Sequence, residues 1–152
     1  MHEIEFELPT EADTVILGKR LAKIAKKGDV FALYGTLGMG KSVLARAFIQ
    51  ELCGDIDVPS PTFTLLQTYG SQDYDIYHFD LYRIKSPEDV FELGIEDAFY
   101  TGISLIEWPQ QMGSYLPSDI FKIEITPFKN SRKLKITTSS SDKHTRLLSL
   151  KE

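Results

Sequence analysis

From residue 30 to residue 42 the chain reads Val30-Phe31-Ala32-Leu33-Tyr34-Gly35-Thr36-Leu37-Gly38-Met39-Gly40-Lys41-Ser42. The first five residues are apolar, and a continuous apolar run of this length is typical of a strand buried on both faces of a parallel sheet. After the glycine-rich segment, apolar residues at positions 44, 47, 48 and 52 share one helical face, and Gly54 is a typical helix end. This stretch therefore predicts a strand, a glycine loop and a helix in succession.

The loop from Gly35 to Ser42 has the pattern of a P-loop, which is Gly, four free positions, Gly, Lys and then Ser or Thr. In such a loop the glycines allow backbone amides to surround a phosphate chain at the start of a helix. Lys41 is the candidate to neutralise the outer phosphates, and the Ser42 hydroxyl is a candidate Mg²⁺ ligand. The pattern predicts a site for a nucleoside triphosphate with Mg²⁺, and an ordinary strand-to-helix turn is the alternative.

The rest of the chain extends this unit into one predicted domain that covers residues 1–152. Apolar alternation and short apolar runs predict six further strands, at residues 4–8, 63–69, 74–83, 103–106, 121–125 and 133–137. We expect two antiparallel hairpins, of which the second (121–137) lies at an edge of the sheet. The predicted fold class is α/β: a P-loop NTPase-like three-layer sandwich with a mostly parallel central sheet and antiparallel edge hairpins.

Two further helices are predicted from their end signals. A capping box and apolar residues at helical spacing predict a helix over 11–26 that closes at Gly28. Ser86 and the proline that follows it predict a short helix that ends at Gly94. A run of three serines then reads as a short join, which makes residues 139–152 a candidate flexible end of the domain.

Composition and charge limit the classes of function. The 152 residues are 42% hydrophobic and 26% charged, as in ordinary globular domains, so wholesale disorder is excluded. The sequence shows no apolar run long enough for a membrane span and no secretory signal, so we expect a cytoplasmic protein with no membrane partner. One cysteine allows neither an internal disulfide nor a cysteine cage for a metal. A net charge of -5 argues against a protein that coats nucleic acid.

Two carboxylates follow predicted buried strands and are candidates for the chemistry of hydrolysis. Asp80 follows the apolar run 76–79, and Glu107 follows the run 103–106. The carboxyl ends of parallel strands gather ligands, which favours a site at this edge of the sheet. Thr62, in a loop stiffened by two prolines, could offer a hydroxyl as switch threonines of GTPases do. For each residue alone, a surface acid or a turn residue is an equal or better interpretation.

Four segments carry a more specific signal than the loop pattern. They are the loop at 35–42, Ser60-Pro61-Thr62-Phe63-Thr64-Leu65, Tyr77-His78-Phe79-Asp80-Leu81-Tyr82-Arg83 and Glu107-Trp108-Pro109. In order and spacing, from about residue 4 to residue 138, the chain resembles the TsaE family, the small bacterial ATPases of tRNA threonylcarbamoyladenosine synthesis. The segment around Asp80 is the most diagnostic of the four, because many folds share a P-loop.

The resemblance implies ATP and Mg²⁺ as ligands and a role for each matching residue. The residues implied to hold the phosphates are Gly35, Gly38, Met39, Gly40, Lys41, Ser42 and Val43. Ser42 and Glu107 are implied to hold Mg²⁺, and Asp80 to act in or beside the shell of metal and water. Thr62 belongs to the implied mobile, switch-like loop. The implied catalytic set consists of Lys41, Asp80, Glu107 and Thr62.

The N-terminal helix and the late hairpin also contribute to nucleotide sites of the family, where Glu11 and Arg132 are the matching residues. The chain departs from the family pattern inside the loop, since Thr36, Met39 and Ser42 replace the usual Asp, Ala and Thr. Ser42 keeps the hydroxyl that a metal needs. We therefore expect these departures to alter rate and affinity rather than mechanism.

The resemblance further implies hydrolysis that depends on partners and serves threonylcarbamoyl transfer to tRNA. We expect slow turnover of the isolated protein because no obvious arginine finger accompanies the loop. The implied partners are the proteins TsaB and TsaD, and tRNA is contacted only indirectly or weakly. The distribution of charge agrees, because residues 73–107 contain nine acids against two basic residues, which suits a basic protein surface. From residue 120 onward, eight Lys and Arg stand against three acids, enough for weak contact with phosphates.

Two other functions stay open. One is phosphoryl transfer to a small molecule or a nucleotide, although the five arginines are scattered and do not suggest a lid. The other is a non-catalytic module in which ATP orders residues 59–64 for docking. A GTPase is disfavoured because no guanine-reading Asn-Lys-x-Asp motif occurs. Trp108 is a candidate cover of the site, partner contact or core residue, and His78 is expected to be a packed strand residue rather than a base.

Overall fold

The structure, a computed structural model, describes residues 1–35 and 40–151. Within these residues, seven strands form one mixed sheet in the order β1-β7-β6-β2-β5-β4-β3. The strands are β1 (His2–Leu8), β2 (Val30–Tyr34), β3 (Leu66–Gly70), β4 (Asp75–Asp80), β5 (Ile103–Glu107), β6 (Phe121–Phe128) and β7 (Ser131–Thr138). The central strands β4, β5, β2 and β6 are parallel, and the pairs β3–β4, β6–β7 and β1–β7 are antiparallel. The predicted fold class is confirmed.

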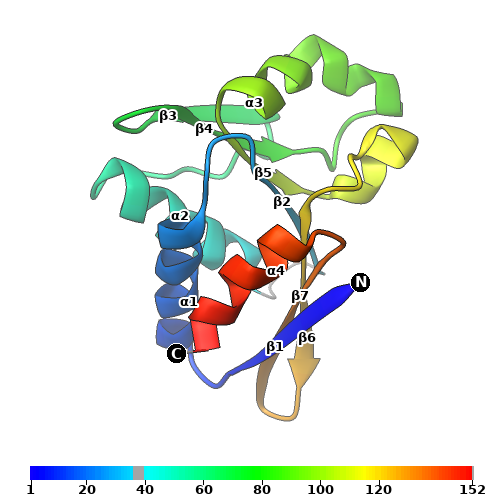
Figure 1. Cartoon of the computed structure of the whole chain (residues 1–152). Coiled ribbons are helices and arrows are strands. Elements are labelled where there is room, and N and C mark those ends of the chain that lie inside the picture. Colours follow the sequence, from blue (N-terminus) through cyan, green and yellow to red (C-terminus); the bar gives the residue numbers. More distant parts are fainter. Residues whose placement is uncertain (36–39, 152) are drawn as a thin grey trace.

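Helices cover both faces of this sheet (Figure 1). On one face lie α1 (Glu11–Ile24), α2 (Lys41–Cys53), α4 (Ser141–Leu148) and the 3₁₀ turn η3 (Ser149–Lys151). On the other lie the 3₁₀ helix η1 (Pro87–Leu93), α3 (Ile95–Thr101) and the 3₁₀ helix η2 (Pro109–Tyr115). Helices α1 and α2 pack closely at Gly18, where the lack of a side chain leaves room for α2. A Cβ at this position would lie only 2.8 Å from the carbonyl oxygen of Leu44. The sheet is therefore the middle of three layers.

Strand β2 separates two apolar cores, which explains its unbroken apolar sequence. Phe31 and Leu33 face α1 and α2, whereas Ala32 faces the layer of η1, α3 and η2. None of the three residues is more than 1% exposed. The strand is buried on both faces, as its sequence predicts.

The carboxyl ends of the parallel strands meet at one edge of the sheet. Glu107 of β5 is in register with Leu33 of β2 on one side and with Asp80 of β4 on the other. Strand β1 ends and β7 begins at the same edge, where Leu8 is opposite Arg132. Residues from both halves of the chain are thus gathered at this edge, next to the glycine loop.

The predicted end of the first helix is wrong by a few residues. Helix α1 ends at Ile24 with Ala25 as its C-cap, so Gly28 is not the cap. Gly28 does have a positive φ of 92°, but its N–H donates to the carbonyl oxygen of Gly102 at 2.7 Å. This glycine therefore ties the turn before β2 to the turn before β5.

Both predicted hairpins form, but the hairpin at 121–137 is not itself at the edge of the sheet. Its strands β6 and β7 pair with β2 and β1 respectively, so β1 is the edge strand on that side. Between β1 and β7, the ammonium of Lys133 lies 2.8 Å from the carboxylate of Glu5, and that of Lys135 lies 3.9 Å from the carboxylate of Glu3. Opposite charges across the two strands favour this pairing by a small amount.

The candidate flexible end at 139–152 forms α4 and η3 as far as the structure describes it. The hydroxyl of Ser140 accepts a backbone hydrogen bond from the first turn of α4, and Leu147 is fully buried against the core of α1. Arg146 donates two hydrogen bonds to the carboxylate of Asp29, at 2.7 and 3.0 Å, and this partner raises the pKa of the guanidinium. Helix α4 is therefore an integral part of the packed structure.

Helices α3 and η2 were not predicted. Gly94, expected only to end the preceding helix, adopts the left-handed conformation and also begins α3. Pro109 begins η2 directly after Trp108, which itself has a positive φ of 59°. Among the described residues, every helix is too short or too polar to cross a membrane.

Candidate nucleotide and metal site

The described ends of the glycine loop both require glycine. Gly35, at the end of β2, has a φ of 144°, and a Cβ there would lie 2.9 Å from the carbonyl oxygen of Ile125. Gly40, the N-cap of α2, has a φ of 98° in the left-handed region. A residue with a side chain would strain the backbone at either position. Two predicted phosphate-binding residues, Gly38 and Met39, lie outside the described residues.

The first turn of α2 carries the predicted phosphate and metal groups Lys41, Ser42 and Val43. Lys41 is only 5% exposed, and its ammonium lies 4.6 Å from the centre of the Trp108 ring. Burial lowers the pKa of Lys41 below its usual value of 10.5, while the nearby carboxylates Glu107 and Asp80 oppose this shift. A buried cation at the positive end of a helix is poorly solvated, which favours binding of an anion there.

The two predicted carboxylates lie side by side at the ends of neighbouring strands. Asp80 and Glu107 are opposite each other in the register of β4 and β5, and they are 5% and 8% exposed. One Asp80 oxygen, Oδ1, accepts the backbone N–H of Tyr82 at 3.0 Å. The backbone carbonyl of Glu107 accepts the N–H of Leu81 at 3.1 Å. Backbone hydrogen bonds therefore hold both acids beside the start of α2.

Thr62 is brought to this pair from the loop before β3. Its hydroxyl donates to Oδ2 of Asp80 at 3.0 Å and lies 2.7 Å from the hydroxyl of Ser60. The loop is tied down further at Leu65, whose carbonyl accepts the N–H of Asp80 at 3.0 Å and whose φ of 68° is unusual for a residue with a side chain. Such local strain is often found at functional sites.

His78 also contacts the site, although the sequence favoured only a packing role. Its Nε2 lies 2.7 Å from Oε2 of Glu107, and the residue is 2% exposed. A signal was present in the sequence, because His78 precedes Asp80 by two positions and alternate strand residues share one face of a sheet. That face also bears Glu107, which is opposite Asp80 in register.

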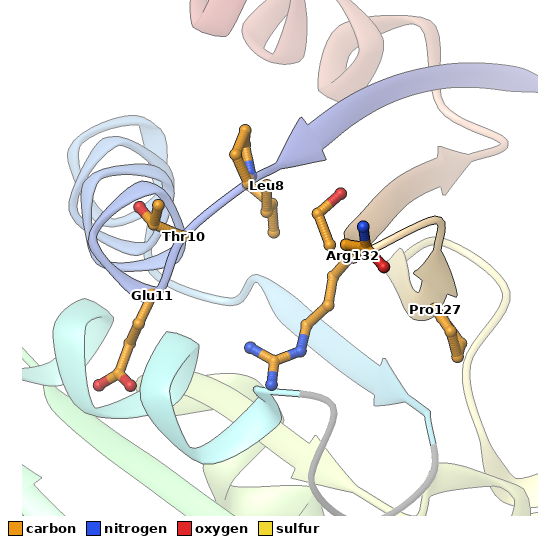
Figure 2. Close-up of a pocket in the computed structure, with 8 residues that line it drawn as sticks. Leu8, Thr10, Glu11, Pro127 and Arg132 are labelled. Atoms are coloured by element: carbon orange, nitrogen blue, oxygen red, sulfur yellow. The ribbon is translucent and has the colours of Figure 1, made fainter.

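A pocket of about 310 Å³ adjoins the glycine loop on the side of β1 and β7 (Figure 2). The residues that line it are Leu8, Pro9, Thr10, Glu11, Pro127, Asn130, Ser131 and Arg132. Figure 2 shows Glu11 and Arg132 entering from opposite sides, with their charged ends directed to the same side of the pocket. A Cβ on Gly40 would lie 3.6 Å from Nη1 of Arg132, so the guanidinium is close to the start of α2. The two predicted residues outside the loop thus line one pocket, and Arg132 lies beside the start of α2.

The oxygen donors at the loop suit Mg²⁺ better than a softer metal. Glu107 offers Oε1, which has no hydrogen-bond partner among the described residues, and Ser42 offers an exposed hydroxyl one position after Lys41. Among the residues described, no group of three or more His, Cys, Asp or Glu side chains forms a metal cluster. Mg²⁺ commonly takes few protein ligands and completes its shell with water and phosphate oxygens. The donor set therefore fits a nucleotide-borne Mg²⁺.

The fold and this site define the class as P-loop NTPase-like. The chain belongs to the TsaE family: a family model described as "Threonylcarbamoyl adenosine biosynthesis protein TsaE" matches residues 8–135. Proteins named tRNA threonylcarbamoyladenosine biosynthesis protein TsaE are 40% identical in Rickettsia felis, over 89% of this chain and 80% of that protein, and 33% identical in Haemophilus influenzae, over 93% of each. A crystal structure of Bacillus subtilis YdiB is similar, with a TM-score of 0.82 and 25% identity over 99% of this chain and 95% of that chain. The family resemblance of the sequence is confirmed.

Trp108 is expected to report nucleotide binding through its fluorescence. Its ring contacts the Lys41 ammonium, and Lys41 must turn toward a phosphate chain when one is bound. Tyr82 also packs against the indole, with ring centres 4.8 Å apart, so loss of the cation changes a defined environment. Titration with Mg·ATP should shift the intensity or the emission maximum. An emission spectrum that stays the same at saturating nucleotide would place Trp108 outside the site.

Proposed function

We propose that this protein is a Mg²⁺-dependent ATPase that acts in the threonylcarbamoyladenosine modification of tRNA. The observation that carries the proposal is the meeting of the glycine loop, Lys41 and two strand-end carboxylates at one edge of the sheet. Membership of the TsaE family supports the process, because its curated relatives are named for threonylcarbamoyladenosine biosynthesis. The proposed partners are TsaB and TsaD, with tRNA contacted through them.

The proposed site divides binding and hydrolysis between its elements. Lys41 and the amides at the start of α2 bind the phosphates, and Ser42 and Glu107 hold Mg²⁺. Bound Mg²⁺ supplies charge neutralisation for the phosphate oxygens. Asp80 and Thr62 orient water near the terminal phosphate, since their oxygens already share a hydrogen bond at 3.0 Å. Glu11 and Arg132 extend the nucleotide site into the adjoining pocket.

Two contacts at the site support gating by the nucleotide. Lys41 is held against Trp108, and Thr62 is held on Asp80. Lys41 must leave Trp108 to reach the phosphates, whereas the hydrogen bond between Thr62 and Asp80 already joins the loop before β3 to the carboxylate that orients water. Phe63, next to Thr62, is 81% exposed and contacts solvent where a protein partner could bind. A residue that contacts the site and an exposed aromatic side chain are therefore neighbours in one loop.

Phosphate release with and without purified TsaB and TsaD tests the proposed function. The isolated protein should turn over slowly, well below the roughly 10 per second that is typical of enzymes, and the two partners together should accelerate it. Stimulation that requires both partners supports the proposal. A free-standing rate of about 10 per second or more that the partners leave unchanged favours a small-molecule kinase or another independent enzyme instead.

A further inference from the structure

The contact between His78 and Glu107 is the most deeply buried polar pair at the proposed metal site. The two side chains are 3% and 11% exposed, and Nε2 and Oε2 are 2.7 Å apart. Lys41, although close, forms no ion pair with this carboxylate. Among the described residues, His78 is therefore the one side chain that hydrogen-bonds Glu107.

The surroundings of the other imidazole nitrogen, Nδ1, indicate which nitrogen of His78 carries the hydrogen. Its Nδ1 is buried and has no hydrogen-bond partner among the described residues. An unprotonated Nδ1 without a hydrogen-bond partner costs less free energy in that place than an Nδ1–H buried without an acceptor. The imidazole therefore carries its hydrogen on Nε2 and donates it to Oε2 of Glu107.

This geometry leaves one carboxylate oxygen held and the other available. Oε2 accepts the charge-assisted hydrogen bond from His78, whereas Oε1 has no partner among the described residues. The register of β4 and β5 places His78 beside Leu105, two residues before Glu107 on the same face, so the imidazole approaches the carboxylate from the interior of the sheet. The remaining oxygen, Oε1, is then left without a hydrogen bond from the described residues.

We propose that His78 is a positioning residue, which orients Glu107 so that its second oxygen binds the divalent cation. The inference rests on the proposed function, because it assumes that Glu107 is a Mg²⁺ ligand. Hydrogen bonds that orient metal ligands in this way typically change metal affinity by about 10- to 100-fold. The role is distinct from catalysis, since His78 acts through the Glu107 carboxylate.

The test compares His78→Leu, which removes the donor, with His78→Gln, which keeps an amide donor. Calorimetry measures ADP affinity in EDTA and then at rising free Mg²⁺, and the electron paramagnetic resonance of Mn²⁺ gives metal affinity directly. His78→Leu should raise, by about 10- to 100-fold, the Mg²⁺ concentration that gives half of the maximal change in ADP affinity. The affinity for ADP in EDTA should be unchanged. His78→Gln should recover most of the metal affinity. His144→Leu, on α4, is the matched control and should leave Mg²⁺ dependence unaltered.

Each other outcome overturns the inference. If His78→Leu matches the wild-type Mg²⁺ dependence, His78 does not position the ligand. If ADP affinity in EDTA falls as much as metal affinity and Gln restores neither, the role is only structural. Should His78→Leu fail to fold, His78→Phe keeps a planar ring without nitrogens and takes its place. A wild-type protein that binds ADP with no effect of Mg²⁺ overturns the proposed function itself, and this inference with it.

Discussion

Lys41→Met is expected to weaken the binding of Mg·ATP by about 100-fold or more, because it removes the buried cation that we propose binds the phosphates. Methionine keeps nearly the same length and fills the space against Trp108 without the charge. Calorimetry at constant Mg²⁺ measures the loss. Lys27→Met, an exposed lysine in the turn before β2, is the matched control and should bind nucleotide normally.

The same substitution should raise the stability of the ligand-free protein. Burial lowers the pKa of Lys41, so the folded state disfavours the ammonium and is destabilised by it. This cost is fully present at low and neutral pH, where the lysine is charged in both states, and it declines as the pH rises from the lowered pKa toward 10.5. Urea midpoints at pH 7.5 should therefore favour Lys41→Met, and the difference should shrink at higher pH. A variant with intact nucleotide affinity would contradict the assignment of Lys41.

Glu107→Gln is expected to lower phosphate release by about 100-fold or more, because the amide is a poor ligand for Mg²⁺ and cannot neutralise its charge. Gln keeps the size of Glu and can still accept a hydrogen bond from His78, so the fold should persist. Nucleotide binding in EDTA should be close to that of the wild type, since Lys41 and the amides of α2 are unchanged. Phosphate release and calorimetry on the same preparation separate the two effects.

The matched control for this substitution is Glu51→Gln, an exposed acid at the other end of α2. It should leave both nucleotide binding and turnover intact. Unchanged turnover in Glu107→Gln would show that Glu107 is not the metal ligand. A wild-type protein that binds nucleotide and responds to its partners without any phosphate release would instead favour the non-catalytic, nucleotide-gated module.

The part of the site that rests on local sequence could be predicted well. An apolar run, a fixed spacing of glycines and a helical period determine β2 and α2 within a short stretch of chain, so Gly35, Gly40 and Lys41 lie where their pattern implies. Asp80 and Glu107 follow the same logic, because acids at the ends of buried strands converge when those strands are parallel. The first group of residues depends on local sequence alone, whereas the two acids also depend on the parallel pairing of β4 with β5.

Contacts between distant segments were harder to predict. The edge position of β1 depends on its pairing with β7. The sequence signal for this pairing was the opposite charge of Glu5 and Lys133, each in a segment with alternating apolar and polar residues. The serine run before α4 resembles a linker, yet Ser140 is a helix cap and Leu147 reaches the core. The contact of His78 with Glu107 was not predicted, because a histidine in a strand looks the same in sequence whether it only packs or also forms a hydrogen bond.

The pairing of Arg146 with Asp29 has a consequence for the choice of fragments for expression. Asp29 immediately precedes β2, the strand that leads into the glycine loop, and its carboxylate is 4% exposed. The family match ends at residue 135, so a fragment cut there would lack α4 and leave this acid buried without its cation. Such losses commonly cost about 3 to 5 kcal/mol. Expression boundaries should extend through Lys151, so that α4 is complete and Arg146 stays paired with Asp29 at the start of β2.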